Sequence, residues 1–188
     1  HTPQDFSRLF EIEPSPTNNI PAGKVLRYLY VTFWDVASGT QIDKILVGGG
    51  EDDFYGLTFS PDGTNFVVLL QLLIKPMTLS YWSRAGGSTS WSLIRTSETE
   101  RRSCSMECPM IFSPDGTILA LGTSGNGSIK LLEMSNGTLL TTLKGHKPNY
   151  DTLWDYTLNM EAQLFSPDGK LLVTSGEDGL LFIWGVRP

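Results

Sequence analysis

The chain has 188 residues, enough for one domain with a buried core, and 40% of them are hydrophobic. Its 14 Lys and Arg against 20 Asp and Glu give a net charge of −6, so it lacks the basic face with which nucleic-acid-binding proteins contact phosphates. Nineteen Gly and eleven Pro require short elements and frequent turns, which argues against a helical bundle.

The sequence offers no sign of a membrane span, a metal site or a cofactor site. Its longest apolar run, residues 66–74 with Gln71 inside it, is far shorter than the roughly 18 residues that cross a bilayer. Cys104 and Cys108 are the only cysteines, with no Cys or His beside them to complete a tetrahedral metal site. We therefore expect a pair of reduced or packed thiols and a cytoplasmic location.

The first 24 residues read as an N-terminal extension rather than as a regular repeat. They contain four prolines, which are poorly suited to strands. Residues 6–13 could still supply one strand, and the outer edge of the last repeat is one candidate place for it.

A five-residue motif, Phe-Ser-Pro-Asp-Gly, then occurs three times, at residues 59–63, 112–116 and 165–169, at intervals of 53 residues. Ser starts a tight turn, Pro presets its φ, and Asp and Gly adopt the conformations that close it. Apolar residues precede each copy and a β-rich run follows it. Each copy therefore predicts two antiparallel strands joined by a hairpin turn.

A second series of short apolar stretches lies between the copies of the motif. These stretches end at Trp34, Trp82, Leu132 and Trp184, which are 48, 50 and 52 residues apart. A turn sequence and a further strand candidate follow the first three of them. Each unit of about 50 residues therefore reads as a four-stranded antiparallel meander.

Four-stranded meanders of this kind predict an all-β fold in which each sheet covers its neighbour. A single such sheet cannot bury both faces, whereas sheets arranged radially as the blades of a β-propeller can. A β-sandwich with accidental similarity between hairpins is the alternative, and the two interleaved series of repeats argue against it.

The motifs of the chain resemble those of the WD-repeat β-propellers over roughly residues 25–186. Trp34-Asp35 is the dipeptide that ends the third strand of a blade in that family, and Gly145-His146 matches the dipeptide before the next blade. The resemblance implies one structural network in the last blade, in which a hydroxyl of Thr174 or Ser175 links His146 to Trp184. His146 would also contact Asp178.

Three departures from the family pattern occur, and those in the second and third units limit this network to one blade. The turn region of the second unit, residues 72–76, has no Asp or Gly. Gly185 follows Trp184 where the family has Asp. The third unit has Asn126 in place of the turn acid and Leu132 in place of Trp, so we expect no such network there.

About 3.5 to 4 blades fit into residues 25–188, with approximate blade ends at the four positions of the second series. Two arrangements are open: an arc of a larger ring, or a compact four-bladed ring closed by residues 1–24. We favour the arc, because about 3.5 units fall short of the 4 to 8 blades that propellers usually carry.

The function that this fold implies is a non-enzymatic scaffold for protein–protein interaction, or a regulatory module, with protein or peptide partners or other domains of the same polypeptide. Strand direction places its candidate partner-binding residues on one rim, and they are Asp52, Asp53, Tyr55, Arg101, Arg102, Tyr150, Trp154, Tyr156 and Glu177. The alternative is a propeller enzyme of the hydrolase or lactonase kind, with a metal in its central channel. Two histidines and no paired-carboxylate pattern argue against it.

Overall fold

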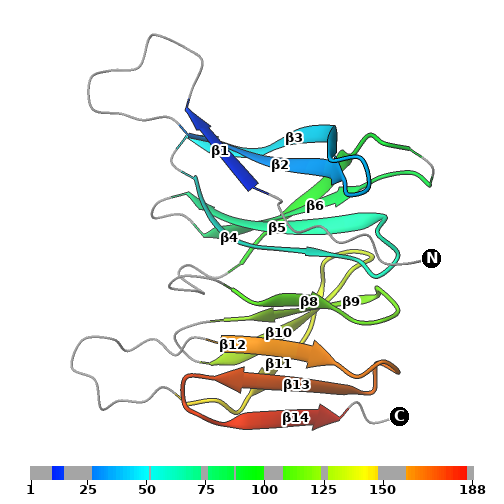
Figure 1. Cartoon of the computed structure of the whole chain (residues 1–188). Helices are drawn as coiled ribbons and strands as arrows, with labels where there is room; N and C mark the ends of the chain where they lie inside the picture. Colours follow the sequence, from blue (N-terminus) through cyan, green and yellow to red (C-terminus); the bar gives the residue numbers. More distant parts are fainter. Residues whose placement is uncertain are drawn as a thin grey trace, which may run out of the picture.

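The computed structural model describes residues 10–14, 27–50, 52–72, 76–86, 88–99, 108–123, 127–147 and 160–185. Fourteen β-strands in these ranges form four antiparallel sheets, stacked one after another in chain order (Figure 1). Within the same ranges there is no helix of the length and apolarity that a bilayer crossing requires. The predicted all-β fold of propeller blades is confirmed.

The four sheets are numbered here along the chain. Sheet 1 contains β1 (Phe10–Pro14), β2 (Arg27–Asp35) and β3 (Thr40–Gly50). Sheet 2 contains β4 (Asp52–Phe59), β5 (Asn65–Leu72), β6 (Met77–Ser83) and β7 (Ser92–Glu98). Sheet 3 contains β8 (Met110–Phe112), β9 (Ile118–Gly122), β10 (Ser128–Glu133) and β11 (Leu139–Lys144). Sheet 4 contains β12 (Met160–Phe165), β13 (Leu171–Gly176) and β14 (Leu181–Gly185).

The N-terminal strand lies in the first sheet and not in the last, so the alternative of a ring closed by residues 1–24 is wrong. β1 pairs with β2, with Phe10 opposite Val31. Because β2 carries Trp34 as β14 carries Trp184, β1 holds the second place in its sheet, like β5, β9 and β13. Among the described residues, sheet 1 therefore has no innermost strand and sheet 4 has no outermost strand.

The three copies of the repeated motif form the same hydrogen-bonded turn. In the first copy the Ser60 hydroxyl donates to Asp62 over 2.6 Å, and it accepts the N–H of Asn65 over 2.9 Å. The second and third copies repeat both bonds. The glycine of each turn has φ near +70°, a conformation that residues with a Cβ rarely adopt.

Three hydrophobic clusters lie between successive sheets and hold the stack together. The side chains of β5 alternate between two of them: Phe66, Val68 and Leu70 face sheet 1, whereas Val67 and Leu69 face sheet 3. The third cluster joins sheets 3 and 4 through residues such as Ile129 and Leu172. The innermost strand β8 contacts both other innermost strands, β4 and β12, and the three mark the axis side of the arc.

No further sheet covers the two ends of the stack within the described ranges. On sheet 4, Leu164, Leu181 and Ile183 are each more than 60% exposed. On sheet 1, Trp34 and Leu46 are exposed as well. The described sheets therefore form an open arc with an apolar face at each end, in agreement with the arc that we favoured.

Cys108 is buried and disulfide-bonded. The expectation of reduced thiols is therefore wrong. The thiols no longer support a cytoplasmic location.

Candidate interaction surface

Strand direction separates the two edges of the arc. The innermost strands β4, β8 and β12 all begin at the edge on the left of Figure 1, where the β13–β14 turn also lies. The three Ser-Pro-Asp-Gly turns lie at the opposite edge. We call the first edge the entry rim.

A groove of about 250 Å³ lies on the entry rim where the three innermost strands begin. Its lining residues come from β4, from the residues before β8, and from β12, and they are Phe54, Tyr55, Gly56, Leu57, Cys108, Pro109, Met160 and Glu161. The lining residues are mostly apolar by type, but polar atoms make up as much of the groove surface as apolar ones, and Glu161 of sheet 4 supplies the one side-chain carboxylate.

Close backbone approach at Gly56 shapes this groove. A Cβ at Gly56 would lie 2.8 Å from the carbonyl oxygen of Cys108 and 3.1 Å from the Cε atom of Met110. The N–H of Cys108 donates to the carbonyl oxygen of Tyr55 over 2.9 Å. On the next strand, the side-chain amide of Gln163 donates to the Pro109 carbonyl over 2.8 Å. These bonds tie the three innermost strands together at the rim.

The structure describes four of the nine predicted rim residues. Asp53 is exposed in β4, and Glu177 is exposed in the β13–β14 turn. Tyr55 is half-buried, because it packs against the cluster between sheets 2 and 3 as well as lining the groove. Asp52 begins β4. The other five, Arg101, Arg102, Tyr150, Trp154 and Tyr156, lie outside the described residues and stay predictions.

Sequence reasoning missed Glu161, which is exposed and lines the groove. It follows Met160, whose buried side chain belongs to the cluster between sheets 3 and 4. Glu161 is the extra residue of a β-bulge between Met160 and Ala162, an irregularity that strand alternation does not predict.

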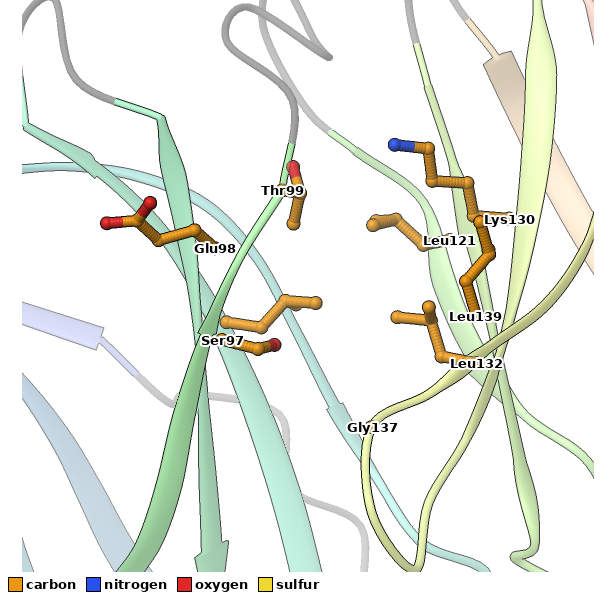
Figure 2. A pocket seen from close by; sticks show the side chains of 9 residues that line it. Ser97, Glu98, Thr99, Leu121, Lys130, Leu132, Gly137 and Leu139 are labelled. Carbon is orange, nitrogen blue, oxygen red and sulfur yellow. The ribbon is translucent and has the colours of Figure 1, made fainter.

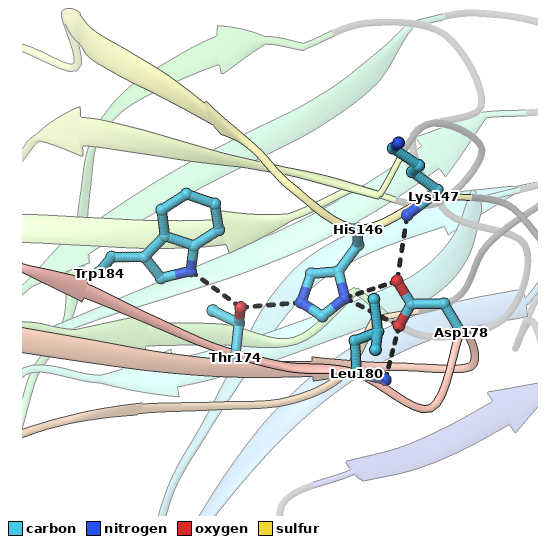
Figure 3. A network of polar contacts seen from close by, with 6 residues as sticks. All are labelled: His146, Lys147, Thr174, Asp178, Leu180 and Trp184. Atoms are coloured by element: carbon cyan, nitrogen blue, oxygen red, sulfur yellow. Dashed lines mark hydrogen bonds and ion pairs between the residues drawn. The ribbon is translucent and has the colours of Figure 1, made fainter.

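The four residues predicted to form a structural network lie in one hydrogen-bonded chain beneath the β13–β14 turn (Figure 3). The indole N–H of Trp184 donates to the Thr174 hydroxyl over 3.0 Å. The same hydroxyl lies 2.9 Å from Nε2 of His146, whose Nδ1 lies 2.9 Å from Asp178. His146 and Thr174 are buried, so each bond satisfies a group that water does not reach.

The direction of these bonds follows from the donors available. The carboxylate of Asp178 can only accept, so Nδ1 of His146 carries a proton and donates to it. Nε2 of the same ring then accepts from the Thr174 hydroxyl, whose oxygen accepts from Trp184. Every polar hydrogen of these four side chains thus has an acceptor.

Asp178 joins this network to two backbone groups. Its carboxylate accepts the N–H of Lys147 over 3.0 Å and that of Leu180 over 3.1 Å. Burial alone would raise the pKa of Asp178, but hydrogen bonds from His146, Leu180 and Lys147 together hold that pKa below its ordinary value of 3.8. The carboxylate therefore fixes both the loop after β11 and the β13–β14 turn.

The lack of a side chain at Gly145 allows the rings of Trp184 and Phe182 to pack against the backbone there. A Cβ there would lie 2.7 Å from Cη2 of Trp184 and 3.0 Å from Cε1 of Phe182. The Phe182 ring stacks on Trp184 at 5.4 Å and meets the His146 ring edge-on at 4.6 Å. The Gly145-His146 dipeptide thus combines close aromatic packing with a buried polar contact.

Sheets 2 and 3 do not form this network. In sheet 2, Trp82 pairs with Phe66 as Trp184 pairs with Leu172, but Val68 stands where Thr174 would be. In sheet 3, the buried hydroxyls of Thr123 and Ser128 lie 2.8 Å apart and close the β9–β10 connection. This Thr–Ser pair is a substitute that the sequence pattern did not reveal.

Within the described ranges, no three or more His, Cys, Asp or Glu side chains are grouped so that they could hold a metal ion.

Comparison with known proteins agrees with the repeat and the fold. Residues 137–185 match the family described as WD domain, G-beta repeat. WD repeat-containing protein 3 of Mus musculus is 26% identical over 93% of this chain. Target of rapamycin complex subunit wat1 of Schizosaccharomyces pombe is 30% identical over 58% of it. The chain spans only 17% and 30% of the lengths of these two relatives.

Among solved structures, the β-propeller domain of Cps50 (Swd1) from Myceliophteria thermophila superposes with a TM-score of 0.61 at 17% identity. It covers 87% of this chain, and this chain corresponds to 48% of that domain.

Proposed function

We propose that this chain, which belongs to the WD-repeat β-propeller proteins, is a non-enzymatic scaffold that presents its entry rim to a protein or peptide partner. The observation that carries the proposal is the groove at the entry rim, to which three different sheets contribute. A surface assembled from several sheets can contact one partner at several points.

Three exposed acids on the described part of the entry rim, against one exposed cation there, Lys147, favour a basic segment as the partner. Asp53, Glu161 and Glu177 are exposed there, and they come from β4, β12 and the β13–β14 turn. The net charge of −6 adds to their attraction for cations. A basic peptide whose apolar side chains enter the groove would satisfy both features of the rim.

The relatives support a role in assembly. One is a subunit of the target of rapamycin complex by its name, so a protein with a similar segment works within a larger complex. We extend this to the present chain as a general property, a surface for protein partners, and not as membership of that complex.

Charge reversal on the entry rim tests the proposal. The variant Asp53→Lys/Glu161→Lys and the control Asp43→Lys, which changes an acid on the outer strand β3, would be compared with the parent in quantitative affinity capture. We expect at least one specific partner of the parent to be lost from the rim variant and kept by the control. Equal capture of every partner by all three proteins would contradict the proposal.

Metal addition separates a scaffold from a metal-dependent propeller enzyme. A scaffold should show no large, specific rise in melting temperature when a divalent cation is added. A saturable rise with one cation would favour the enzyme instead.

A further inference from the structure

The sheets of the arc contact one another through side chains that recur at the same places in each sheet. Two of these places lie one and three positions before the residue that ends the second series, in strands β2, β6 and β10. The side chains there are Val31 and Phe33 in sheet 1, Leu79 and Tyr81 in sheet 2, and Ile129 and Leu131 in sheet 3. All of them pack against the following sheet, and all but Leu131 are at most 4% exposed.

In sheet 4 the same two places have no sheet to contact among the described residues. They are occupied by Leu181 and Ile183, each 64% exposed. β13 and β14 contain no charged residue, whereas the terminal unit of a soluble repeat stack usually has a polar outer face. The end of sheet 4 therefore has the composition of a contact between sheets and not that of a cap.

Sheet 1 presents the complementary half of such a contact. The residue that ends the second series faces the preceding sheet, because Trp82, Leu132 and Trp184 pack in the successive clusters between the sheets. Trp34 holds this place in sheet 1 and is 39% exposed. Leu46, which is 49% exposed, lies on the same face. Each end of the arc therefore lacks the half that the other end has.

The contact between sheets 2 and 3 shows how two such halves meet (Figure 2). Leu121 and Leu132 project from sheet 3 toward β7 and belong to one cluster with Leu79 of sheet 2. A cavity of about 340 Å³ remains beside Leu132, between β7 and β11. The same contact between two copies of the arc would cover Leu181 as sheet 3 covers Leu79.

Two ends that fit each other lead to a closed ring or to an open filament, depending on the rotation from one copy to the next. The curvature of the arc favours a ring of two copies. The arc superposes on the propeller domain of Cps50 (Swd1) with a TM-score of 0.61 and corresponds to 48% of that domain, so two copies with this curvature would complete one turn. Four sheets from each copy give a ring of eight, within the roughly four to eight blades of propellers.

We propose that two copies of this chain close one ring, in which sheet 4 of each copy packs against sheet 1 of the other. The two contacts are identical, and a twofold axis through the centre of the ring relates the copies. Both entry rims then lie on the same side of the ring, so a partner with two binding segments can contact both grooves at once. The inference extends the scaffold function without depending on it, because no residue of the end faces lines the groove.

The mass of the 188-residue chain in solution is the first test. One chain has a mass of 20.8 kDa, and light scattering coupled to size-exclusion chromatography should give twice this value. No larger species should appear as the concentration rises, because a closed ring has no free end. The mass of one chain at every concentration would overturn the proposal, and so would a mass that keeps rising, which an open filament would give.

A charge placed on either end should separate the copies. Leu181→Glu/Ile183→Glu changes the end of sheet 4 and Trp34→Glu the end of sheet 1, and each should have the mass of one chain, because the contact would bury unpaired carboxylates. The control Leu93→Glu/Ile94→Glu removes two exposed apolar side chains from the outer strand β7 and should keep the mass of the parent. Ile183→Ser is the milder substitution if the double variant of sheet 4 does not fold. A folded end variant with the parent's mass would contradict the proposal.

Mixing the two end variants distinguishes contact between unlike ends from contact between like ends. Each variant keeps one intact end, so the mixture should form a pair through a single contact. This pair should dissociate at a concentration at least about tenfold higher than the parent does, because the second contact is lost. If like ends met, one of the two variants would stay paired on its own. That result, or a mixture of single chains, would overturn the proposal.

The entry rim variant separates this inference from the proposed function. Asp53→Lys/Glu161→Lys leaves both end faces intact and should keep the mass of the parent. Unchanged partner capture by that variant would overturn the entry rim proposal and leave the ring standing. The mass of a single chain for the parent would do the reverse.

Discussion

The indole nitrogen of Trp184 donates to the hydroxyl of Thr174 over 3.0 Å, and the equivalent tryptophan of sheet 2 makes no such bond. Trp82 packs in the cluster that contains Val68, and its buried Nε1 has no hydrogen-bond partner in the described part of the chain. A buried N–H without an acceptor costs free energy, of the order of 1–3 kcal/mol. The difference between Thr174 and Val68 thus decides whether the indole N–H of the neighbouring tryptophan has a hydrogen-bond acceptor.

Removing the Thr174 hydroxyl should destabilise sheet 4. Thr174→Val keeps the shape of the side chain but leaves the indole N–H of Trp184 and Nε2 of His146 unpaired. We expect a loss of about 2–3 kcal/mol in the free energy of unfolding, measured by urea denaturation. Adding Trp184→Phe should cost less in the Thr174→Val variant than in the parent, because the two residues share one bond.

Ser175→Ala is the control for this prediction. It removes a hydroxyl from the neighbouring position of β13, which faces the opposite side of the sheet. We expect a change within about 0.5 kcal/mol. Equal losses from the two substitutions would show that the hydroxyl of Thr174 has no special role.

The reverse experiment supplies a hydrogen-bond acceptor for the indole N–H of Trp82 in sheet 2. Val68→Thr would place a hydroxyl beside Nε1 of Trp82, while Val67→Thr would place one in the cluster on the other face of β5. Both valines are fully buried, so both variants lose apolar burial to a similar extent. We expect Val68→Thr to be the more stable by about 1 kcal/mol in thermal or urea unfolding, because only its hydroxyl meets an unpaired donor.

A methyl group at Gly145 should be poorly tolerated. It would come within 2.7 Å of Trp184, so the rings of Trp184 and Phe182 must shift. We expect Gly145→Ala to lower the free energy of unfolding by about 1–3 kcal/mol. Gly86→Ala is the control, since a Cβ there meets nothing within 4 Å, and a similar loss in both variants would disprove the packing explanation.

Acid should weaken the repeated turns. Hydrogen bonds from Ser60, Ser113 and Ser166 lower the pKa of the aspartates that follow them, Asp62, Asp115 and Asp168. In the unfolded chain these carboxyls have the ordinary value of 3.8, so they bind protons there at a pH at which the folded protein does not. Their stabilisation is therefore fully present above that value, and it is lost progressively as the pH falls below it and through the lower pKa of the folded state.

Urea denaturation between about pH 7 and pH 3 measures this effect. The unfolding midpoint of the parent should fall at the acidic end of the range. Asp115→Asn should be less stable than the parent at neutral pH, and the difference should narrow in acid, where the parent loses the same charge. A constant difference at every pH would contradict the assignment.

The sequence was sufficient to predict the repeats because their signals are local. Each Ser-Pro-Asp-Gly turn depends on bonds between residues at most five positions apart, such as Ser60 and Asn65. The contacts of His146 and Trp184 lie within one repeat as well, and for them a resemblance to a known family supplied the pairing that spacing alone does not.

Features that depend on pairing between residues far apart in the sequence could not be predicted from the sequence. Nothing local indicates that β1 joins β2 rather than the last sheet, because either edge offers the same backbone groups. The cavity beside Leu132 likewise required the position of β7 from the preceding repeat. The rim residues that fall outside the described ranges, Trp154 among them, stay predictions.

The alternation of β5 between two clusters has a consequence for how that strand finds its alignment. Residues 66–70 are apolar and buried at every position, so a slip of one residue would exchange Val67 for Val68 and still bury hydrophobic surface on both sides. Polarity therefore cannot choose between the two alignments. The choice falls to the hairpin that precedes β5, where the Ser60 hydroxyl accepts the N–H of Asn65, and that short turn sets the alignment for the middle of the molecule.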